Sequence, residues 1–404
     1  MTQHAMVGTA QRNAVSPTAS TAFYVPFGSE LSTAQTTEAN VQTTLRIGCS
    51  MANLYVNLPT NTRTATAFGV SVNGSPSALT VSSTATTTGL YSDLSHVIAV
   101  ASTDKAEFVI TAGSGGGSIQ VSGLTCDLQS TGQAATQFGG NVATSLSTSA
   151  RFLSFSGTFT AQTSDTNIQM VALEAATMSN MQVVFTVNAS AGFTVTSRKN
   201  AGAGSQSISV GASATGLFED NTNTDSLSAL DTFDFSVGAN TSAPTISAAT
   251  CKWTTGTASH CQANNSRPSS PLASGATDYA ALYASPLLTT TQSSCFTPMP
   301  YAATLSLLSA KITANSSAAG ATFNQYGGAA GTTALNGTVA LGTGTGTVQD
   351  VTHTDSLAAA DLANMRGTGA SANIQLGWAG VVIVGPNTSP PSGNNSLLTL
   401  GVGN

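Results

Sequence analysis

The segment Gly89-Leu90-Tyr91-Ser92-Asp93 returns twice along the chain, and this repetition decides the fold. It recurs as Gly216-Leu217-Phe218-Glu219-Asp220 and, more weakly, as Gly346-Thr347-Val348-Gln349-Asp350. The intervals are 127 and 130 residues, far longer than the roughly 20–50 residues of one solenoid repeat and close to the size of a domain. The sequence therefore predicts three related domains in series, which favours a scaffold or a fibre over an enzyme.

Each repeat is expected to be a β-sandwich. Short β-branched segments alternate with Gly, Asp and Asn positions, and Asn73-Gly74 separates two such segments as in a type I′ hairpin. About 80–100 residues accommodate eight strands, which favours a jelly-roll-like arrangement over an immunoglobulin-like one. The predicted fold class is all-β, with three tandem jelly-roll-like β-sandwich domains and an extended N-terminal arm. The expected boundaries are an arm at 1–43, sandwiches at 44–128, 150–253 and 301–386, a linker at 254–300 and a tail at 387–404.

The two segments outside the sandwiches have distinct compositions. Residues 1–43 are polar except for an aromatic cluster of Phe23, Tyr24 and Phe27 around Pro26, which predicts an arm that anchors on a partner; a frayed terminus is the alternative. The segment 254–300 contains five prolines and is long for a compact connection. We expect it to lie along a domain surface or a neighbouring chain.

The chain has very few charged side chains. They make up 7% of residues, against about 25% in typical soluble domains, while hydrophobic residues reach 41% and allow a core in each repeat. Such a surface repels its neighbours poorly and suits an ordered assembly, although a secreted bacterial surface protein can show a similar bias. The net charge of −6 without a basic stripe argues against nucleic acid and against anionic membranes as partners.

The N-terminus, Met1 to Gly8, shows neither the cationic nor the apolar region of a signal peptide. No run of 18 apolar residues occurs, so no spanning helix is expected. These features predict synthesis in a host cytoplasm followed by display elsewhere, or export without an N-terminal signal.

Five cysteines leave at least one thiol unpaired within the chain. Cys49 and Cys126 fall in the expected first and last strands of the first sandwich, which are often neighbours, so a Cys49–Cys126 disulfide is one prediction. Cys251 and Cys261 would close a short loop. The alternative is that all five are small buried apolar side chains.

No catalytic constellation or cofactor motif is found, so the expectation is a protein that is not an enzyme and has no cofactor. The four histidines are scattered, and the usual metalloprotease, hydrolase and phosphate-loop motifs do not occur. The acidic segment with Asp220, Asn223 and Asp225 offers oxygen ligands suited to Ca²⁺. Asn and Asp also populate tight turns, and the turn is the preferred interpretation over a metal site.

These repeats resemble the β-sandwich repeats of structural proteins of tailed bacteriophages, such as head-decoration proteins, head fibres and tail fibres. The resemblance rests on a hydrophobic hairpin followed by Thr-Gly-Leu-Phe-x-Asp, an Asn/Thr stretch and a further strand, over about residues 44–385. The first repeat departs from it with His96-Val97-Ile98, and the third has no aromatic residue in the motif. The resemblance implies a homotrimeric virion component without enzymatic activity.

The leading hypothesis is therefore a virion surface protein that decorates or projects from the capsid, stabilises the shell or mediates weak adhesion. Its expected partners are its own copies, the major capsid protein or other virion proteins, and host surface glycans. A tail fibre or receptor-binding protein is the first alternative. A bacterial surface adhesin or carbohydrate-binding module is the second.

Overall fold

The computed structural model describes residues 2–10, 16–29, 35–131, 135–158, 161–283, 288–317, 320–369 and 373–386. Strands make up 59% of the structure and helix only 3%, in short 3₁₀ turns. The all-β prediction is thus confirmed. The expected tail at 387–404 lies outside the described residues.

The strands fall into three groups along the chain. Domain 1 contains β1 (Thr2–Thr9), β2 (Ala22–Val25), η1 (Glu38–Asn40), β3 (Thr43–Thr44), β4 (Cys49–Leu58), β5 (Thr60–Asn61), β6 (Ala67–Val72), β7 (Ser75–Ser82), β8 (Gly89–Asp93), β9 (Ile98–Val100), β10 (Lys105–Thr111), β11 (Ile119–Gln120) and β12 (Gly123–Thr131). Domain 2 contains β13 (Ala135–Ser145), β14 (Arg151–Leu153), β15 (Gly157–Thr158), η2 (Asp165–Asn167), β16 (Met170–Val171), β17 (Ala176–Val187), β18 (Phe193–Lys199), β19 (Gly202–Val210), β20 (Gly216–Leu227), β21 (Thr232–Val237) and β22 (Thr245–Thr255). Domain 3 contains β23 (His260–Leu272), β24 (Thr277–Ala280), η3 (Gln292–Cys295), β25 (Thr297–Pro298), β26 (Ala303–Asn315), β27 (Ala321–Gly327), β28 (Thr333–Leu341), β29 (Gly346–Gln349), β30 (Thr354–Leu357), β31 (Leu362–Thr368) and β32 (Ile374–Val384).

The three domains share one strand order. In each, the first strand pairs with the last, and the last pairs with a long central strand: β1-β12-β4-β8, β13-β22-β17-β20 and β23-β32-β26-β29. The second sheet follows the same rule, with orders β2-β10-β6-β7, β14-β21-β18-β19 and β24-β31-β27-β28. Two facing four- or five-stranded sheets whose strands alternate between them in this order form a jelly roll.

The Asn73-Gly74 hairpin forms as expected. Asn73 has a φ of 52° and Gly74 a φ of 81°, and the flanking residues Val72 and Ser75 are paired in β6 and β7. Positive φ at both central residues is the requirement of a type I′ turn, and Asn followed by Gly meets it with little strain.

The expected N-terminal arm is incorrect as a separate element. β1 pairs along its whole length with β12, from Thr2↔Thr131 to Thr9↔Leu124, and β2 pairs with β10. Both strands therefore belong to domain 1. Almost every residue of β1 is buried, including Gln3 and His4, because other domains cover this strand. Its side chains consequently lack the polar–apolar alternation by which a half-exposed strand is recognised.

The expected linker at 254–300 is likewise part of a sandwich. It contributes the end of β22, and then β23, β24, η3 and β25 of domain 3. β23 is an edge strand that pairs only with β32, and its register shifts between Ser266 and Ser270. An edge strand with an irregularity accommodates proline, so Pro268 and Pro271 do not end it.

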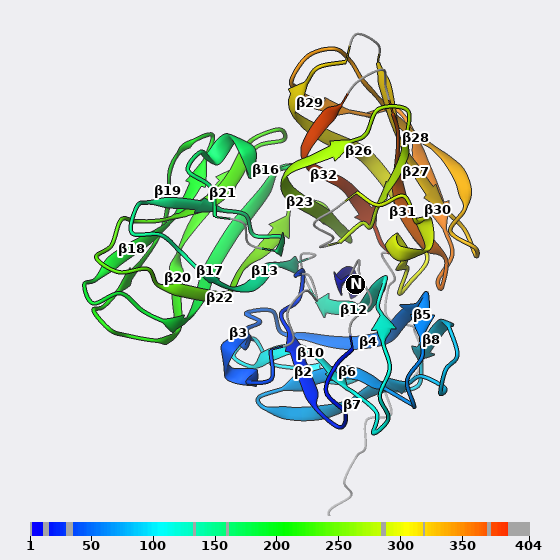
Figure 1. The fold of residues 1–404 in the computed structure, drawn as a ribbon, viewed down its shortest axis with the longest axis horizontal. Helices are drawn as coiled ribbons and strands as arrows, with labels where there is room; N and C mark the ends of the chain where they lie inside the picture. Colours follow the sequence, from blue (N-terminus) through cyan, green and yellow to red (C-terminus); the bar gives the residue numbers. More distant parts are fainter. Residues whose placement is uncertain are drawn as a thin grey trace, which may run out of the picture.

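The domains close into a ring instead of forming a row. Figure 1 shows three lobes around the N-terminus, with β1, β12, β13 and β23 near the centre. β1 contacts both β13 and β23, and β13 contacts β23. Each pair of domains is in contact, and each contact involves an equivalent segment. Domain 2 contacts domain 1 through β17 against η1 and β3, domain 3 contacts domain 2 through β32 against β16, and domain 1 contacts domain 3 through β12 against β25. The chain thus builds a threefold arrangement from its own repeats.

The hydrophobic cores continue across the domain boundaries. One cluster of buried residues spans domains 1 and 3, and includes Leu54 and Phe108 together with Leu305 and Phe323. The cluster of domain 2 takes in Trp378 and Val382 from β32 of domain 3. Burial of apolar side chains between domains, at roughly 25 cal/mol per Å², stabilises the ring as well as its parts.

Candidate interaction surface

The repeated glycine begins an outer strand in each domain and has the backbone conformation that requires glycine. The φ values are 127° for Gly89, 102° for Gly216 and 127° for Gly346. A side chain is strained in this region. No atom lies within 4 Å of the Cβ that a side chain would add at any of the three positions. Glycine is therefore required at these positions by the positive φ of the backbone and not by a lack of space for a side chain.

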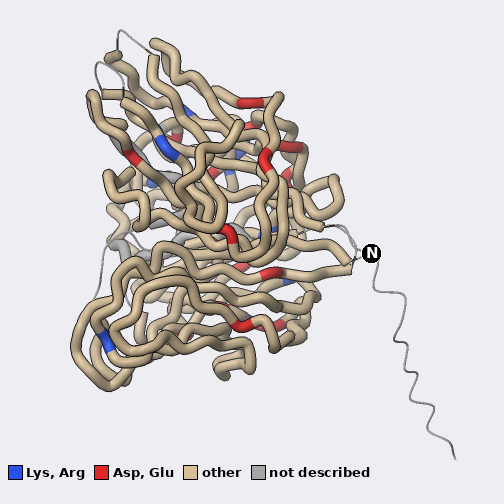
Figure 2. Tube along the Cα trace, turned by 90° about the vertical axis from the view of Figure 1, so that its right-hand side faces the viewer, with Lys and Arg blue, Asp and Glu red and all other residues tan. Residues whose placement is uncertain are grey.

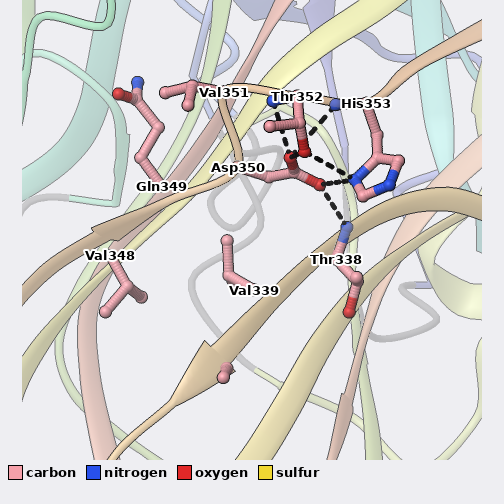
Figure 3. Close-up of a pocket in the computed structure, with 9 residues that line it drawn as sticks. Thr338, Val339, Val348, Gln349, Asp350, Val351, Thr352 and His353 are labelled. Atoms are coloured by element: carbon pink, nitrogen blue, oxygen red, sulfur yellow. Dashed lines mark hydrogen bonds and ion pairs between the residues drawn. The ribbon is translucent and has the colours of Figure 1, made fainter.

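The aspartate that closes the motif organises the turn that follows it. Figure 3 shows Asp350 at the centre of this turn in domain 3. Its Oδ2 accepts from the backbone N–H of Thr338 at 2.9 Å. Its Oδ1 accepts from both the N–H and the hydroxyl of Thr352 and from the N–H of His353, at 2.9–3.1 Å. The Nδ1 of His353 lies 2.8 Å from Oδ2. The carboxylate thus ties two chain segments together.

The same set of contacts recurs in the other two domains. Asp93 accepts from Thr80, Ser95 and His96, and Asp220 accepts from Ser207, Thr222 and Asn223. Each aspartate is 6% exposed. We call these three the aspartate turns; all have a structural role.

Hydrogen bonds stabilise the ionised form of each aspartate. Burial alone would raise the pKa of Asp220, but the hydrogen bonds from Asn223, Ser207 and Thr222 outweigh it and hold the pKa well below its ordinary value. The pKa of Asp350 is lowered in the same way by Thr338, Thr352 and His353 against the effect of burial. The pKa of Asp93 is also lowered, by Ser95, His96 and Thr80.

The acidic segment weighed as a calcium loop is occupied by protein donors. Asn223 directs its amide N–H₂ at Asp220, at 2.9 Å. Asp225 accepts from Ser197, Ser205 and Gln206. The carboxylate oxygens of Asp220 and Asp225 therefore accept hydrogen bonds within the protein, and the described residues contain no cluster of three His, Cys, Asp or Glu side chains suited to a metal.

The aromatic cluster expected to anchor an arm packs inside domain 1. Phe23 is 5% exposed in β2, and Phe27 is fully buried. The Phe27 ring meets the Phe108 ring edge to face, with centroids 4.7 Å apart. Tyr24 is half-buried, and its backbone N–H donates to Gln35. The prediction that this cluster docks on another protein is wrong, because β2 is the edge strand of a sheet of its own domain.

The predicted Cys49–Cys126 disulfide is absent, and all five cysteines are free thiols. Cys126 pairs with Val7 of β1, while Cys49 pairs with Val100 of β9. β4, which carries Cys49, does neighbour β12, but the register places Ser50 opposite Gln129 and Tyr55 opposite Thr125, so Cys49 and Cys126 are offset along the two strands. The proposed bridge between Cys251 and Cys261 is also absent. The alternative of buried thiols is the correct one for Cys126, Cys251, Cys261 and Cys295.

Polar side chains that the sequence did not single out connect the domains. Gln182 of domain 2 bonds both backbone groups of Thr44 in domain 1, each at 2.7 Å. Gln262 of domain 3 bonds the backbone of domain 2 at Val171 and Leu173, at 2.7 and 2.9 Å. In each case a buried glutamine stands in a strand next to a neighbouring domain. Only their burial in the structure marks these glutamines, because nothing in the neighbouring residues indicates a second domain.

The third interface uses hydroxyl groups in the same role. Thr125 and Ser122 of domain 1 donate to the carbonyl oxygens of Pro298 and Phe296 in domain 3, both at 2.9 Å. Thr44, Val171 and Pro298 occupy equivalent places in β3, β16 and β25. Each of them pairs with the first residue of a longer strand, which is β10, β21 or β31. Each domain therefore offers the same backbone segment to its neighbour.

A buried ion pair lies where the three domains meet. The Nδ1 of His4 in β1 is 2.9 Å from Oδ2 of Asp127 in β12, and Asp127 is fully buried. The His4 ring also meets the ring of Tyr301 from domain 3 edge to face, and its backbone N–H faces Ser259. β1 thereby links its own domain to domain 3.

Three of the six large hydrophobic side chains that are exposed in the described part of the chain lie in or next to the aspartate turn of domain 1. Leu90, Leu94 and Val97 are 37%, 59% and 64% exposed. In domain 3 the tip of the equivalent turn carries Val351, which is 69% exposed and lines the shallow pocket of Figure 3. Figure 2 shows how sparsely charged residues are distributed along the chain. We call Leu90, Leu94 and Val97 the apolar turn patch.

No described helix has the length and hydropathy to cross a membrane. Comparison with protein-family models gives no match. A search of curated proteins also finds no matching relative.

Proposed function

We propose that this chain is a structural protein of a tailed-phage virion, which decorates or projects from the capsid surface and stabilises the shell without running a reaction. The observation that carries the proposal is the closed ring of three jelly rolls, an architecture frequent in viral capsid proteins, combined with a surface of few charges. A threefold ring matches threefold positions in a shell built from repeated subunits.

The surface supports association with neighbours. Charged residues make up only 7% of the chain, and several of the acids are engaged inside the protein by turns and interfaces. The apolar turn patch is exposed on domain 1. Exposed apolar groups of this kind mark interaction sites, and the partner we propose is the major capsid protein or a neighbouring copy.

The ring favours capsid decoration over the fibre and adhesin alternatives. A fibre made of tandem domains places its repeats along an axis, whereas these domains contact each other pairwise. None of the exposed large hydrophobic side chains in the described part of the chain is aromatic. A face on which sugar rings could stack is therefore not visible there, and glycan binding would rely on hydroxyl and amide groups.

The proposal is tested by locating the protein on virus particles and by substituting residues of the apolar turn patch to disrupt its contact with the shell. Particles made without this protein are mixed with the purified chain, and binding is measured by co-sedimentation and by electron cryomicroscopy. We expect wild type to add density at repeated positions on the shell, and the double change Leu94→Asp and Val97→Asp to reduce its binding at least tenfold. Thr347→Ala, an exposed change in β29, is the control and should bind as wild type.

Failure to bind particles, together with binding to cell envelopes or to immobilised glycans, would overturn the proposal in favour of an adhesin. Density confined to the tail would support the fibre alternative. The ring within one chain already supplies a threefold arrangement, so the expected homotrimer is a separate question. Light scattering on the purified chain tests it.

A further inference from the structure

Each domain brings two polar side chains together at one equivalent place, which we call the polar pair site. One side chain is the first residue of the 3₁₀ turn: Glu38 in η1, Asp165 in η2 and Gln292 in η3. The other lies in the strand that pairs with β3, β16 or β25, namely β10, β21 or β31: Glu107, Asp234 and Asn364. Each of them stands two positions after the first residue of its strand, which pairs with Thr44, Val171 or Pro298. All three are fully buried.

In domain 3 the polar pair site is neutral. Gln292 donates from Nε2 to Oδ1 of Asn364 at 3.4 Å and to the carbonyl of Gly331 at 3.1 Å. Asn364 donates to the same carbonyl at 2.7 Å. Amide hydrogens thus fill the space between the two side chains, and this domain shows directly that the two positions face each other.

In domain 2 two acids occupy the site and cations compensate them. Arg198, which pairs with Asp234 across the strands, lies 3.0 Å from Asp165 and 3.6 Å from Asp234. Lys311 of domain 3 also acts on both acids and donates to Gln169 of domain 2 at 2.9 Å. A buried pair of carboxylates is costly unless it is neutralised. Arg198 and Lys311 compensate part of this charge, although burial, and then Asp165, still raise the pKa of Asp234 to about 8.

In domain 1 two acids occupy the site without a cation in the corresponding place. Ser71 pairs with Glu107 across the strands, as Arg198 does with Asp234, and the Ser71 hydroxyl donates to Glu38. The groups that face Glu107 are Glu38 from η1, Gln42 after it and Ser71 from β6, with Tyr24 from β2 nearby. In the described structure neither Glu107 oxygen has a well-formed hydrogen bond.

We propose that Glu107 keeps a proton at neutral pH where it faces Glu38, and that loss of this proton loosens the contact between domains 1 and 2. The proton takes the part that Arg198 takes in domain 2 and that amide hydrogens take in domain 3. Two facing carboxyls cannot both ionise at close range without strong repulsion. η1 packs against β17 of domain 2, and the carbonyl of Asn40 in η1 accepts from Ser247 of domain 2 at 2.5 Å. Repulsion of Glu38 therefore acts on this interface.

The direction of the pH effect follows from burial. Burial, and then the neighbouring Glu38, raise the pKa of Glu107 from 4.5 to about 10. The folded protein therefore keeps a proton that the unfolded chain releases between these two values. The stabilisation is complete below pH 4.5 and is lost as the pH rises through about 10. Within this window one retained proton makes the unfolding equilibrium constant rise about tenfold per pH unit.

The first experiment observes the proton in the unaltered protein. The infrared spectrum at pH 7.5 should contain the carbonyl stretch of a neutral buried carboxylic acid, and Glu107→Gln should lose one such band. Asp234→Asn identifies any band from domain 2. A wild-type spectrum in which Glu107→Gln removes no neutral carboxyl band would overturn the proposal.

The second experiment follows stability against pH. Between pH 6 and pH 9 the thermal midpoint of wild type should fall more steeply than that of Glu107→Gln, which copies the neutral site of domain 3. Asp104→Asn, an acid three residues upstream that stays ionised throughout this range, should keep the wild-type slope. If the thermal midpoint fell equally steeply with pH in wild type and in Glu107→Gln, Glu107 would not retain a proton in the folded protein. Stabilisation of wild type at pH 8 by millimolar Ca²⁺ that Glu107→Gln abolishes would also contradict the proposal, since it would assign the site to a cation.

Discussion

The side chain of Gln182 in domain 2 takes the place of a strand partner for Thr44 in domain 1. Its Oε1 accepts from the Thr44 N–H and its Nε2 donates to the Thr44 carbonyl, both at 2.7 Å. Gln182 is fully buried and Thr44 nearly so, so no water replaces these bonds. One amide group thereby satisfies a backbone edge that would otherwise be buried unpaired between two domains.

Gln182→Ala should weaken the ring at this interface. It removes two hydrogen bonds and leaves a backbone donor and acceptor without partners, which costs about 2–4 kcal/mol of unfolding free energy in total. Hydrogen exchange should increase in residues 38–46, and the thermal midpoint should fall. The exposed change Thr347→Ala is the control. Unchanged exchange in 38–46 would mean that apolar packing alone holds the two domains together.

Gly346→Ala should destabilise domain 3 through its backbone alone. The φ of Gly346 is 127°, and a methyl group there meets no atom within 4 Å. The expected loss is about 1–3 kcal/mol, measured by chemical denaturation. Gly344→Ala, two residues earlier, also meets open space but has no positive φ, and should be nearly neutral. Equal losses for the two variants would refute the backbone explanation.

The aspartate turns should make the protein sensitive to acid. Their pKa values lie below the ordinary value of 3.8, so their stabilisation is present above that pH and is lost as the pH falls through the lower folded-state pKa. Asp350→Asn should lower stability at pH 7 by about 1.5–3 kcal/mol and should reduce the difference between pH 7 and pH 3. Thermal melts across this range measure both effects. A variant that retains the full wild-type pH dependence would show that Asp350 does not contribute to it.

The thiols should be protected but not oxidised. Burial raises the pKa of Cys49 to about 12 and that of Cys261 to about 11, so thiolate is scarce at neutral pH. A thiol reagent should label few groups in the native protein and all five after denaturation without reductant. Fewer than five labelled groups in the denatured chain would restore the disulfide hypothesis.

Removal of residues 1–9 should unfold domain 1. These residues include β1, which pairs with β12 and carries the buried His4–Asp127 contact. We expect the thermal midpoint to fall by many degrees and the protein to lose its cooperative transition, as calorimetry would record. An arm that anchors on a partner would leave the transition of the purified protein unchanged, so the two interpretations separate clearly.

The sequence predicted the parts of the fold that depend on local residue patterns. The recurring Gly and Asp mark strand starts and turns because φ and hydrogen bonding at those positions are local requirements, and Asn73-Gly74 specifies its own hairpin. The strands that were missed, β1, β13 and β23, lie at the centre of the ring. Contacts from other domains decide their burial, and such contacts leave no period in the sequence.

For the candidate sites too, features that depend on nearby residues could be predicted, and features that depend on strand pairing or on another domain could not. The turn at Asp220 could be predicted because its donors lie within three residues or on the preceding strand. The disulfide prediction was wrong because the pairing register of β4 and β12, which offsets Cys49 from Cys126, cannot be read from the sequence. Gln182 and Gln262 were overlooked because nothing in their neighbouring residues indicates a second domain.

Fusion of the three repeats into one polypeptide has a consequence for how the ring can vary. A ring of three separate identical chains would carry the same residues at every junction and would come apart on dilution. Here closure is intramolecular, so it does not depend on protein concentration, and each domain has its own chemistry at the polar pair site: an amide pair at Gln292, an arginine at Arg198 and two acids at Glu38 and Glu107. If loss of the Glu107 proton loosens the contact between domains 1 and 2, as proposed above, the ring would open first at that contact.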